Sequence, residues 1–177
     1  MPRSLFHGGV PHNAKDRRVQ VTESFLSTQR VGVPKGDSRT AEEGLRYEQR
    51  VLGLLECQFP GAQLISAPVF RYRAVGDKWR TCIPDAIVVG PSSVLIIEVK
   101  RTHHSGAWHQ LRGLYQKVVE RAYNNSKRVR VLEICKHYDS NVNLPESPII
   151  LESIESAHNL LEDDGIPDSY YVGWMNV

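Results

Sequence analysis

The stretch PDAIVVGPSSVLIIEVK, residues 84–100, decides the fold that the sequence predicts. Two apolar runs flank a turn at residues 90–93, which consists of Gly, Pro and two Ser residues. The second run is continuous, which is typical of a strand that is covered on both faces. We therefore expect strands over residues 78–89 and 94–100, joined by this turn as a hairpin.

Two charged residues interrupt the second strand of this hairpin: Glu98 and Lys100, which lie on the same face. Burying ionised groups there is unfavourable unless they are paired or bind a metal ion. A hairpin that pairs Val89 with Val94 places Asp85 directly across from Glu98, and two facing carboxylates repel each other unless a cation lies between them. The arrangement favours a Mg²⁺ site, and the plainer alternative is a Glu–Lys ion pair at a strand end.

The first predicted helix directs a third acid toward the same core. One stripe of this helix contains a single charged residue, Glu48, among apolar residues at positions 45, 52, 55 and 59. A carboxylate on the core-facing side of a helix needs a role or a partner. Glu48 is therefore a candidate site residue, and an ion pair with Arg46 or Arg50 is the alternative.

The remaining pattern predicts an α/β protein. The expected elements, in chain order, are a helix at 40–59, capped by Ser38 or Thr40, strands at 63–73, 78–89 and 94–100, a helix at 107–123 and a strand at 129–136. This order, αβββαβ, predicts a central mixed sheet flanked by helices.

Three parts of the chain differ in charge and pattern. Residues 1–39 are expected to form an irregular basic arm with one short element near 19–28, and residues 40–137 form the core. Residues 138–177 are expected to form an acidic extension packed on the same domain, with a strand at 148–154, a helix at 154–162 and a terminal segment at 170–174. The basic excess of the first 135 residues is compatible with a polyanionic ligand and equally with a plain solvated surface.

Other features concern the compartment and the isolated side chains. No apolar run approaches the length of a membrane span and no signal-peptide core is present, which predicts a soluble intracellular protein of the cytoplasm or nucleoid without a membrane partner; a viral origin stays open. The cysteines at 57, 82 and 135 are expected to be reduced core residues, and the histidines at 103, 104 and 109 to be exposed in a loop. The tryptophans at 79 and 108 are expected to pack in the core or at its rim rather than to stack on bases.

The pattern of Pro84-Asp85, followed after twelve residues by Glu98-Val99-Lys100, resembles the PD-(D/E)XK nuclease superfamily, which has the restriction-endonuclease-like fold. The resemblance covers about 95 residues, from the helix with Glu48 to the strand that ends near residue 136. It implies that Asp85, Glu98 and the backbone carbonyl of Val99 hold Mg²⁺, for which Mn²⁺ substitutes. Lys100 would position the attacking water or help to deprotonate it, and Glu48 would support the metal directly or through water.

The same resemblance implies contacts to nucleic acid. Gln110 resembles the glutamine of the exonuclease and helicase–nuclease branch, although its spacing from Tyr115 departs from that pattern and Tyr115 also fits an apolar helix stripe. Arg101 and Arg112 would follow the nucleic-acid backbone.

The implied function is Mg²⁺-dependent hydrolysis of DNA phosphodiester bonds, in recombination, repair, restriction or phage DNA processing. One alternative keeps the nuclease fold but makes the chain a catalytically silent DNA-binding or assembly subunit. Another is a salt-bridge network in an unrelated α/β protein. The sequence leaves open endonucleolytic or exonucleolytic cutting, specificity, DNA or RNA as substrate, and a homodimer or a larger assembly.

Overall fold

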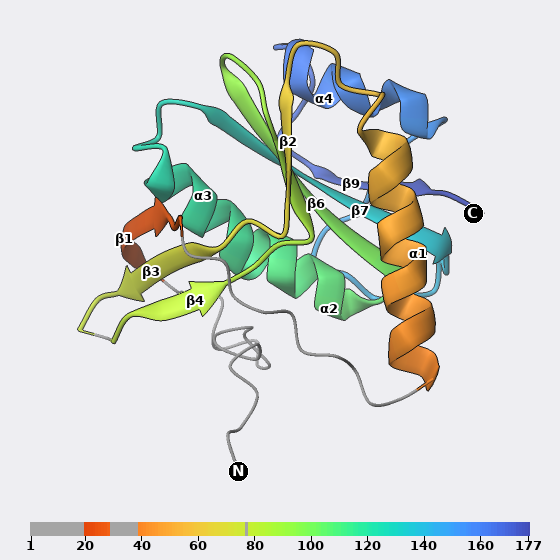
Figure 1. The fold of residues 1–177 in the computed structure, drawn as a ribbon, viewed down its shortest axis with the longest axis horizontal. Coiled ribbons are helices and arrows are strands. Elements are labelled where there is room, and N and C mark those ends of the chain that lie inside the picture. Colours follow the sequence, from red (N-terminus) through yellow and green to blue (C-terminus); the bar gives the residue numbers. More distant parts are fainter. Residues whose placement is uncertain (1–19, 29–38, 77) are drawn as a thin grey trace.

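A computed structural model of the protein describes residues 20–28, 39–76 and 78–177, and its core is a mixed six-stranded sheet flanked by helices (Figure 1). The sheet has the strand order β2 (Gln63–Ser66), β5 (Ala86–Val89), β6 (Ser93–Thr102), β7 (Arg128–His137), β9 (Tyr170–Trp174) and β8 (Ile149–Ile150). Strands β2, β5 and β6 are antiparallel, whereas β6, β7, β9 and β8 are parallel. The predicted α/β class with a mixed central sheet is confirmed.

The hairpin has the predicted register. Val89 pairs with Val94 and Ala86 with Ile97, so the pairing is the one expected from the sequence. Strand β6 is buried from Ser93 to Val99, as its continuous apolar run predicted, because helices cover both faces of the sheet here.

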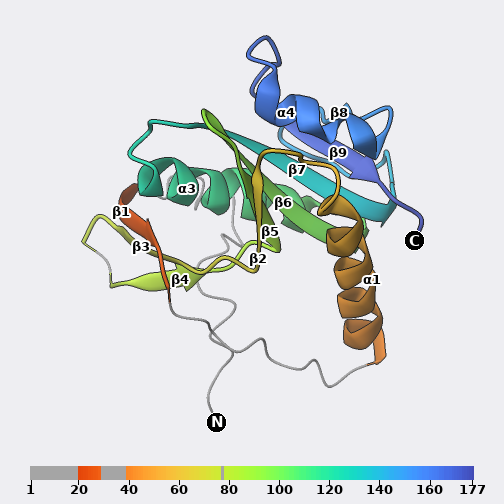
Figure 2. The same cartoon turned by 45° about the horizontal axis from the view of Figure 1, so that its top comes forward.

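Two layers of helices enclose the sheet (Figures 1 and 2). The helical segments are α1 (Arg39–Leu55), α2 (Ser105–Trp108), the π-helical turn η3 (His109–Tyr115), α3 (Gln116–Ala122), the 3-10 turn η4 (Ile154–His158) and α4 (Asn159–Glu162). Helix α1 and the η4–α4 segment pack on one face, against Leu95 and Ile97 of β6. The continuous α2–η3–α3 helix packs on the other face, against Val94 and Ile96. None of the described helices is long and apolar enough to cross a membrane.

Two expected strands are each broken in two. Residues 63–73 form β2 and β3 (Phe70–Ala74), and residues 78–89 form β4 (Arg80–Cys82) and β5. The first break contains Ala67, which has a positive φ of 47°, and Pro68, which lacks an N–H for the ladder. The second break contains Pro84. The prediction of continuous strands was wrong because these prolines let the chain leave the large sheet.

The segment between the two breaks forms a separate small sheet. Strands β3 and β4 pair with each other, and β3 also pairs with β1 (Val21–Leu26), which matches the short element expected near 19–28. The rest of the expected arm, like the capping residue Ser38, lies outside the described residues. Figure 1 shows this small sheet beside α3, opposite the side of the molecule that carries α1.

The acidic C-terminal segment is part of the large sheet. Strand β9 is inserted between β7 and β8, and the helix expected at 154–162 is present as η4 and α4, whereas the strand expected at 148–154 is reduced to two residues. Buried Arg130 of β7 holds this segment: its guanidinium donates to the backbone carbonyls of Leu160 (2.6 Å), Asp163 (3.0 Å) and Ile166 (2.7 Å).

The cysteines agree only in part with their prediction. All three are free, and Cys82 and Cys135 are buried as expected. Cys57 is exposed, so its assignment to the core was wrong. It lies in the turn that follows α1, where the chain has already left the packed face.

We predict that Arg130→Leu lowers the free energy of unfolding by about 3 kcal/mol, because one buried and two partly buried carbonyls lose a charged donor. Urea titration followed by circular dichroism measures this change. The matched control is Arg128→Leu on the same strand, which loses only a solvent-exposed pair with Asp164 and should change stability little. Equal destabilisation by both variants would contradict the bracing role of Arg130.

Candidate active site

The candidate site lies where β6 extends beyond its neighbour β5. The β5–β6 pairing ends at Ala86 and Ile97, so the last residues of β6 have no described strand on this side. The Asp85 side chain takes the place of the missing strand, since the Val99 N–H donates to its Oδ2 at 2.7 Å. The N–H and C=O of one strand residue point to the same side, so the Val99 carbonyl also faces this edge.

A buried ion pair lies next to this edge. Lys100 Nζ donates to Glu98 Oε1 at 2.5 Å, and Glu98 is only 2% exposed. The second carboxylate oxygen of Glu98, Oε2, is buried without a hydrogen-bond partner among the described residues. The hairpin register, continued by one residue, places Asp85 opposite Glu98. A partnerless carboxylate oxygen beside a second carboxylate favours binding of a cation.

Glu48 joins this site from α1. Burial raises the pKa of its carboxyl, the charge of Glu98 raises it further, and Lys100 opposes both. The predicted stripe of α1 is rotated, however: the buried positions are Tyr47, Val51, Leu52 and Leu55. Leu45 is 37% exposed and Glu48 is half-buried, so Glu48 lies at the margin of the buried face rather than at its centre.

The carboxylates influence one another electrostatically. Burial raises the pKa of Asp85 well above its ordinary value, and the charges of Glu98 and Glu48 raise it further. Lys100 and the hydrogen bond from Val99 act in the opposite direction but do not reverse the shift. Protonation therefore relieves repulsion that a bound cation would also relieve.

Lys100 keeps its proton in this environment. Burial by itself lowers the pKa of the ammonium group, but Glu98 and Asp85 outweigh it, and the net shift is upward. The side chain is thus a buried hydrogen-bond donor with a fixed positive charge next to the carboxylates.

The π-helical turn η3 brings Gln110 and Tyr115 together. Its i→i+5 hydrogen bonds, such as Gln116 N–H to Leu111 O, align residues five positions apart on one side of the helix. Burial raises the pKa of Tyr115 well above its ordinary value, as do the charges of Glu98 and Asp85, while a hydrogen bond with Gln110 lowers it. The five-residue spacing of Gln110 and Tyr115, which departs from the pattern of the resembled family, therefore fits the π turn beside the candidate site.

A second polar network supports the site from β7, and the sequence analysis missed it. Glu133 pairs in register with Glu98, and its Oε2 contacts His103 Nδ1 at 2.7 Å and accepts a hydrogen bond from Tyr170 at 2.6 Å. Its Oε1 has no partner among the described residues. The sequence feature that could have indicated this network is an acidic residue within the mainly apolar run 129–135. His103 is 2% exposed, so the prediction of an exposed loop histidine was wrong for it.

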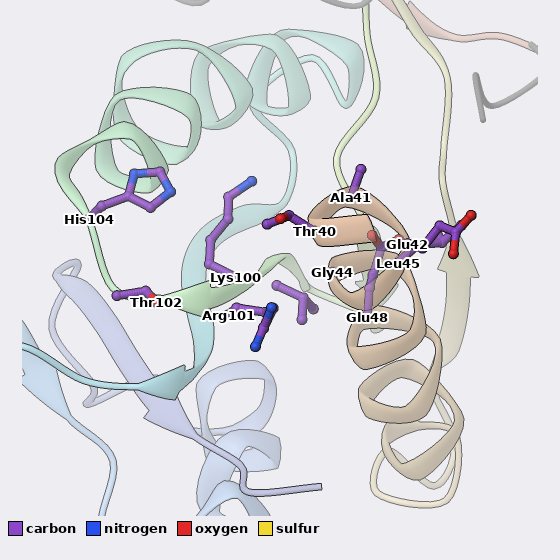
Figure 3. Close-up of a pocket in the computed structure, with 11 residues that line it drawn as sticks. Thr40, Ala41, Glu42, Gly44, Leu45, Glu48, Lys100, Arg101, Thr102 and His104 are labelled. Carbon is purple, nitrogen blue, oxygen red and sulfur yellow. The ribbon is translucent and has the colours of Figure 1, made fainter. Parts of the chain in front are cut away.

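A hollow of about 750 Å³ opens beside Lys100, between β6, the start of α1 and the start of α2 (Figure 3). Its lining residues are Thr40, Ala41, Glu42, Gly44, Leu45, Glu48, Val99, Lys100, Arg101, Thr102 and His104. Arg101 forms an ion pair with Glu43 of α1 at 2.6 Å. We call this space the first hollow.

Arg112 lies apart from the first hollow. Its guanidinium binds Glu146 at 2.6 Å and Asp168 at 2.7 Å, and Trp108 Nε1 donates to the same Glu146. These contacts fix the two loops that carry Glu146 and Asp168 to the helix. A nucleic-acid contact of Arg112 stays a prediction, which this pairing does not favour.

Comparison of the chain with models of protein families, with curated proteins and with solved structures finds no match. The chemistry of the site therefore rests on its own residues.

The donor set at the edge of β6 suits a hard cation. Asp85, Glu98 and the Val99 carbonyl offer oxygen atoms only, which Mg²⁺ and Mn²⁺ prefer. Within residues 20–28, 39–76 and 78–177, no three His, Cys, Asp or Glu side chains are grouped closely enough to bind an ion by themselves. The unpartnered Glu98 Oε2 nevertheless fits a cation that completes its shell with a carbonyl oxygen, water and a substrate phosphate.

We predict that Asp85→Asn stabilises the metal-free protein at pH 7.5, because it removes a buried charge that two neighbouring carboxylates repel. The folded-state pKa of Asp85 is raised, so its proton stabilises the fold fully below its ordinary value of 3.8, and this contribution is lost as the pH rises through the folded pKa. The gain from the substitution should therefore shrink toward pH 4, as measured by thermal unfolding in EDTA. The exposed Glu152→Gln is the control, and an Asp85→Asn variant that is less stable at pH 7.5 would contradict the electrostatic analysis.

Proposed function

We propose that this protein is a Mg²⁺-dependent nuclease that hydrolyses DNA phosphodiester bonds on a restriction-endonuclease-like core. The observation that carries the proposal is the buried, partnerless Oε2 of Glu98, which lies beside Lys100 and across from Asp85 at a free strand edge. An ion pair alone explains Glu98 Oε1 but leaves Oε2 and the repelling Asp85 without a purpose.

The metal would be held by Asp85, Glu98 and the carbonyl of Val99, with Glu48 supporting it directly or through water. When bound, Mg²⁺ or Mn²⁺ supplies positive charge to the phosphate and lowers the pKa of a coordinated water. The Val99 N–H keeps the Asp85 carboxylate oriented toward the edge of β6.

Lys100 would act on the phosphate as a positive donor. Its raised pKa favours a protonated side chain that donates to a non-bridging oxygen and offsets the charge that develops there. The same geometry suits orientation of the attacking water better than removal of its proton.

The first hollow suits the substrate around the scissile bond. The start of α1 lines it, so the positive end of a 17-residue helix dipole favours phosphate groups there. Gln110, hydrogen-bonded to Tyr115, would approach the nucleotide from the opposite helix. Such an enzyme would serve recombination, repair, restriction or phage DNA processing.

We predict that the protein cuts DNA in Mg²⁺ or Mn²⁺ and not in EDTA, and that Asp85→Asn or Lys100→Met reduces kcat/KM by at least about 10³-fold. Supercoiled plasmid and end-labelled linear DNA, resolved by size, report cutting and distinguish endonucleolytic from exonucleolytic products. Glu152→Gln should cut like the wild type. Cleavage that persists in EDTA, or in both site variants, would refute the proposal and favour the alternatives of a silent subunit or a plain salt-bridge network.

We predict a milder effect for Glu48→Gln. Loss of a supporting carboxylate should weaken Mg²⁺ binding by about 10- to 100-fold while saturating metal restores most of kcat. Calorimetric titration with Mg²⁺ and a metal titration of the cutting rate measure the two quantities. A kcat loss as large as that of Asp85→Asn at saturating Mg²⁺ would instead make Glu48 a direct metal ligand.

A further inference from the structure

A second hollow, of about 310 Å³, lies next to the first and is lined mainly by basic side chains. Its lining residues are Glu43, Arg46, Tyr47, Arg50, Arg101, Lys136 and Val177. Four of these side chains are basic, and Glu43 is the one acidic side chain. The proposed catalytic chemistry uses none of these basic groups, and only Arg101 has a nucleic-acid role among those that the resemblance implies.

Regular secondary structure builds this second hollow. The α1 residues that line it are spaced three, four and seven positions after Glu43, so they share one face of the helix. The β6–β7 register pairs Lys100 with Cys135 and Thr102 with His137, which makes Arg101 and Lys136 neighbours. Strand alternation directs both toward α1, as it does for Val99 and Ile134.

The basic groups of the second hollow lack enough acidic partners. Arg101 is paired with Glu43, but no described carboxylate forms an ion pair with Arg46, Arg50 or Lys136. Arg46 and Arg50 are also one helical turn apart, where like charges repel. An anion in this hollow would contact several cations, of which Arg46 and Arg50 are exposed to solvent, and arginine binds phosphate through two parallel hydrogen bonds.

The two hollows meet at Arg101, which lines both of them. Its ion-pair partner Glu43 lines the second hollow. Because Lys100 precedes Arg101 on β6 and faces the catalytic edge, a strand with its scissile phosphate at Lys100 can reach the second hollow across Arg101. A phosphate there can replace the Glu43 carboxylate as the partner of Arg101.

We infer that the second hollow binds backbone phosphates of the nucleic-acid strand that flank the scissile bond, through Arg46, Arg50, Arg101 and Lys136. This inference rests on the proposed nuclease function, to which it adds the path of the substrate. The site recognises phosphate groups and reads no base, so the binding is independent of sequence.

The test measures binding without cleavage. A fluorescein-labelled 20-base-pair DNA duplex is titrated with the full chain in EDTA, and anisotropy gives Kd between 50 and 200 mM salt. Arg50→Gln and Arg46→Gln should each lower the slope of log K against log salt by about 0.9 and weaken binding about eightfold at 0.1 M salt, the loss of one phosphate contact.

The matched control is Gln49→Glu, a neighbour on α1 outside the hollow that changes the net charge by the same amount as Arg50→Gln. It should leave the slope unchanged and Kd within about twofold. Equal effects of Arg50→Gln and Gln49→Glu, an unchanged slope in both arginine variants, or no binding of DNA would overturn the inference.

The outcome is separable from that of the nuclease proposal. If the arginine variants show the expected changes in salt slope but the protein does not cut DNA, phosphate binding in the second hollow is supported and the nuclease proposal is refuted. Metal-dependent cutting with wild-type binding by the arginine variants would support the nuclease and overturn the phosphate path.

Discussion

The site depends on one constraint, which is that β6 continues beyond the strand that pairs with it. The buried strand carries Glu98 and Lys100 at this position. The Asp85 carboxylate accepts the hydrogen bond from the Val99 N–H that a backbone carbonyl of a neighbouring strand would otherwise accept. The free edge lets groups from both sides of the sheet approach each other. Glu48 from α1 and Tyr115 from η3 therefore reach the same carboxylates although their helices cover opposite faces.

The buried carboxylates of the site lower the stability of the metal-free fold. Burial raises the pKa values of Asp85 and Glu48, and repulsion from the neighbouring carboxylates raises them further. Behind them, Glu133 places another acid in the core, held by His103 and Tyr170. Such buried networks hold side chains rigidly when most of their atoms are satisfied. One carboxylate oxygen of Glu98 and one of Glu133 have no hydrogen-bond partner among the described residues. The proposed cation would provide a partner for the oxygen of Glu98.

Charge is also arranged along α1. The start of the helix and Lys100 border the first hollow, while the basic face of the helix borders the second. Arg101 lines both hollows, and its ion pair with Glu43 lies on the side of the second. A surface of this kind favours a polyanion that extends over several phosphates rather than a small anion bound at one point.

The sequence by itself determined the hairpin, its register and the convergence of Asp85 with Glu98, because strand alternation and a short turn are local constraints. Only the tertiary structure decided the rest. Which face of α1 is buried depends on the elements that pack against it. The π turn that aligns Gln110 with Tyr115 cannot be recognised from the spacing of apolar residues. The burial of His103 requires Glu133, which comes from another strand. The second hollow likewise unites residues of three elements, whose separation along the chain hides their common charge.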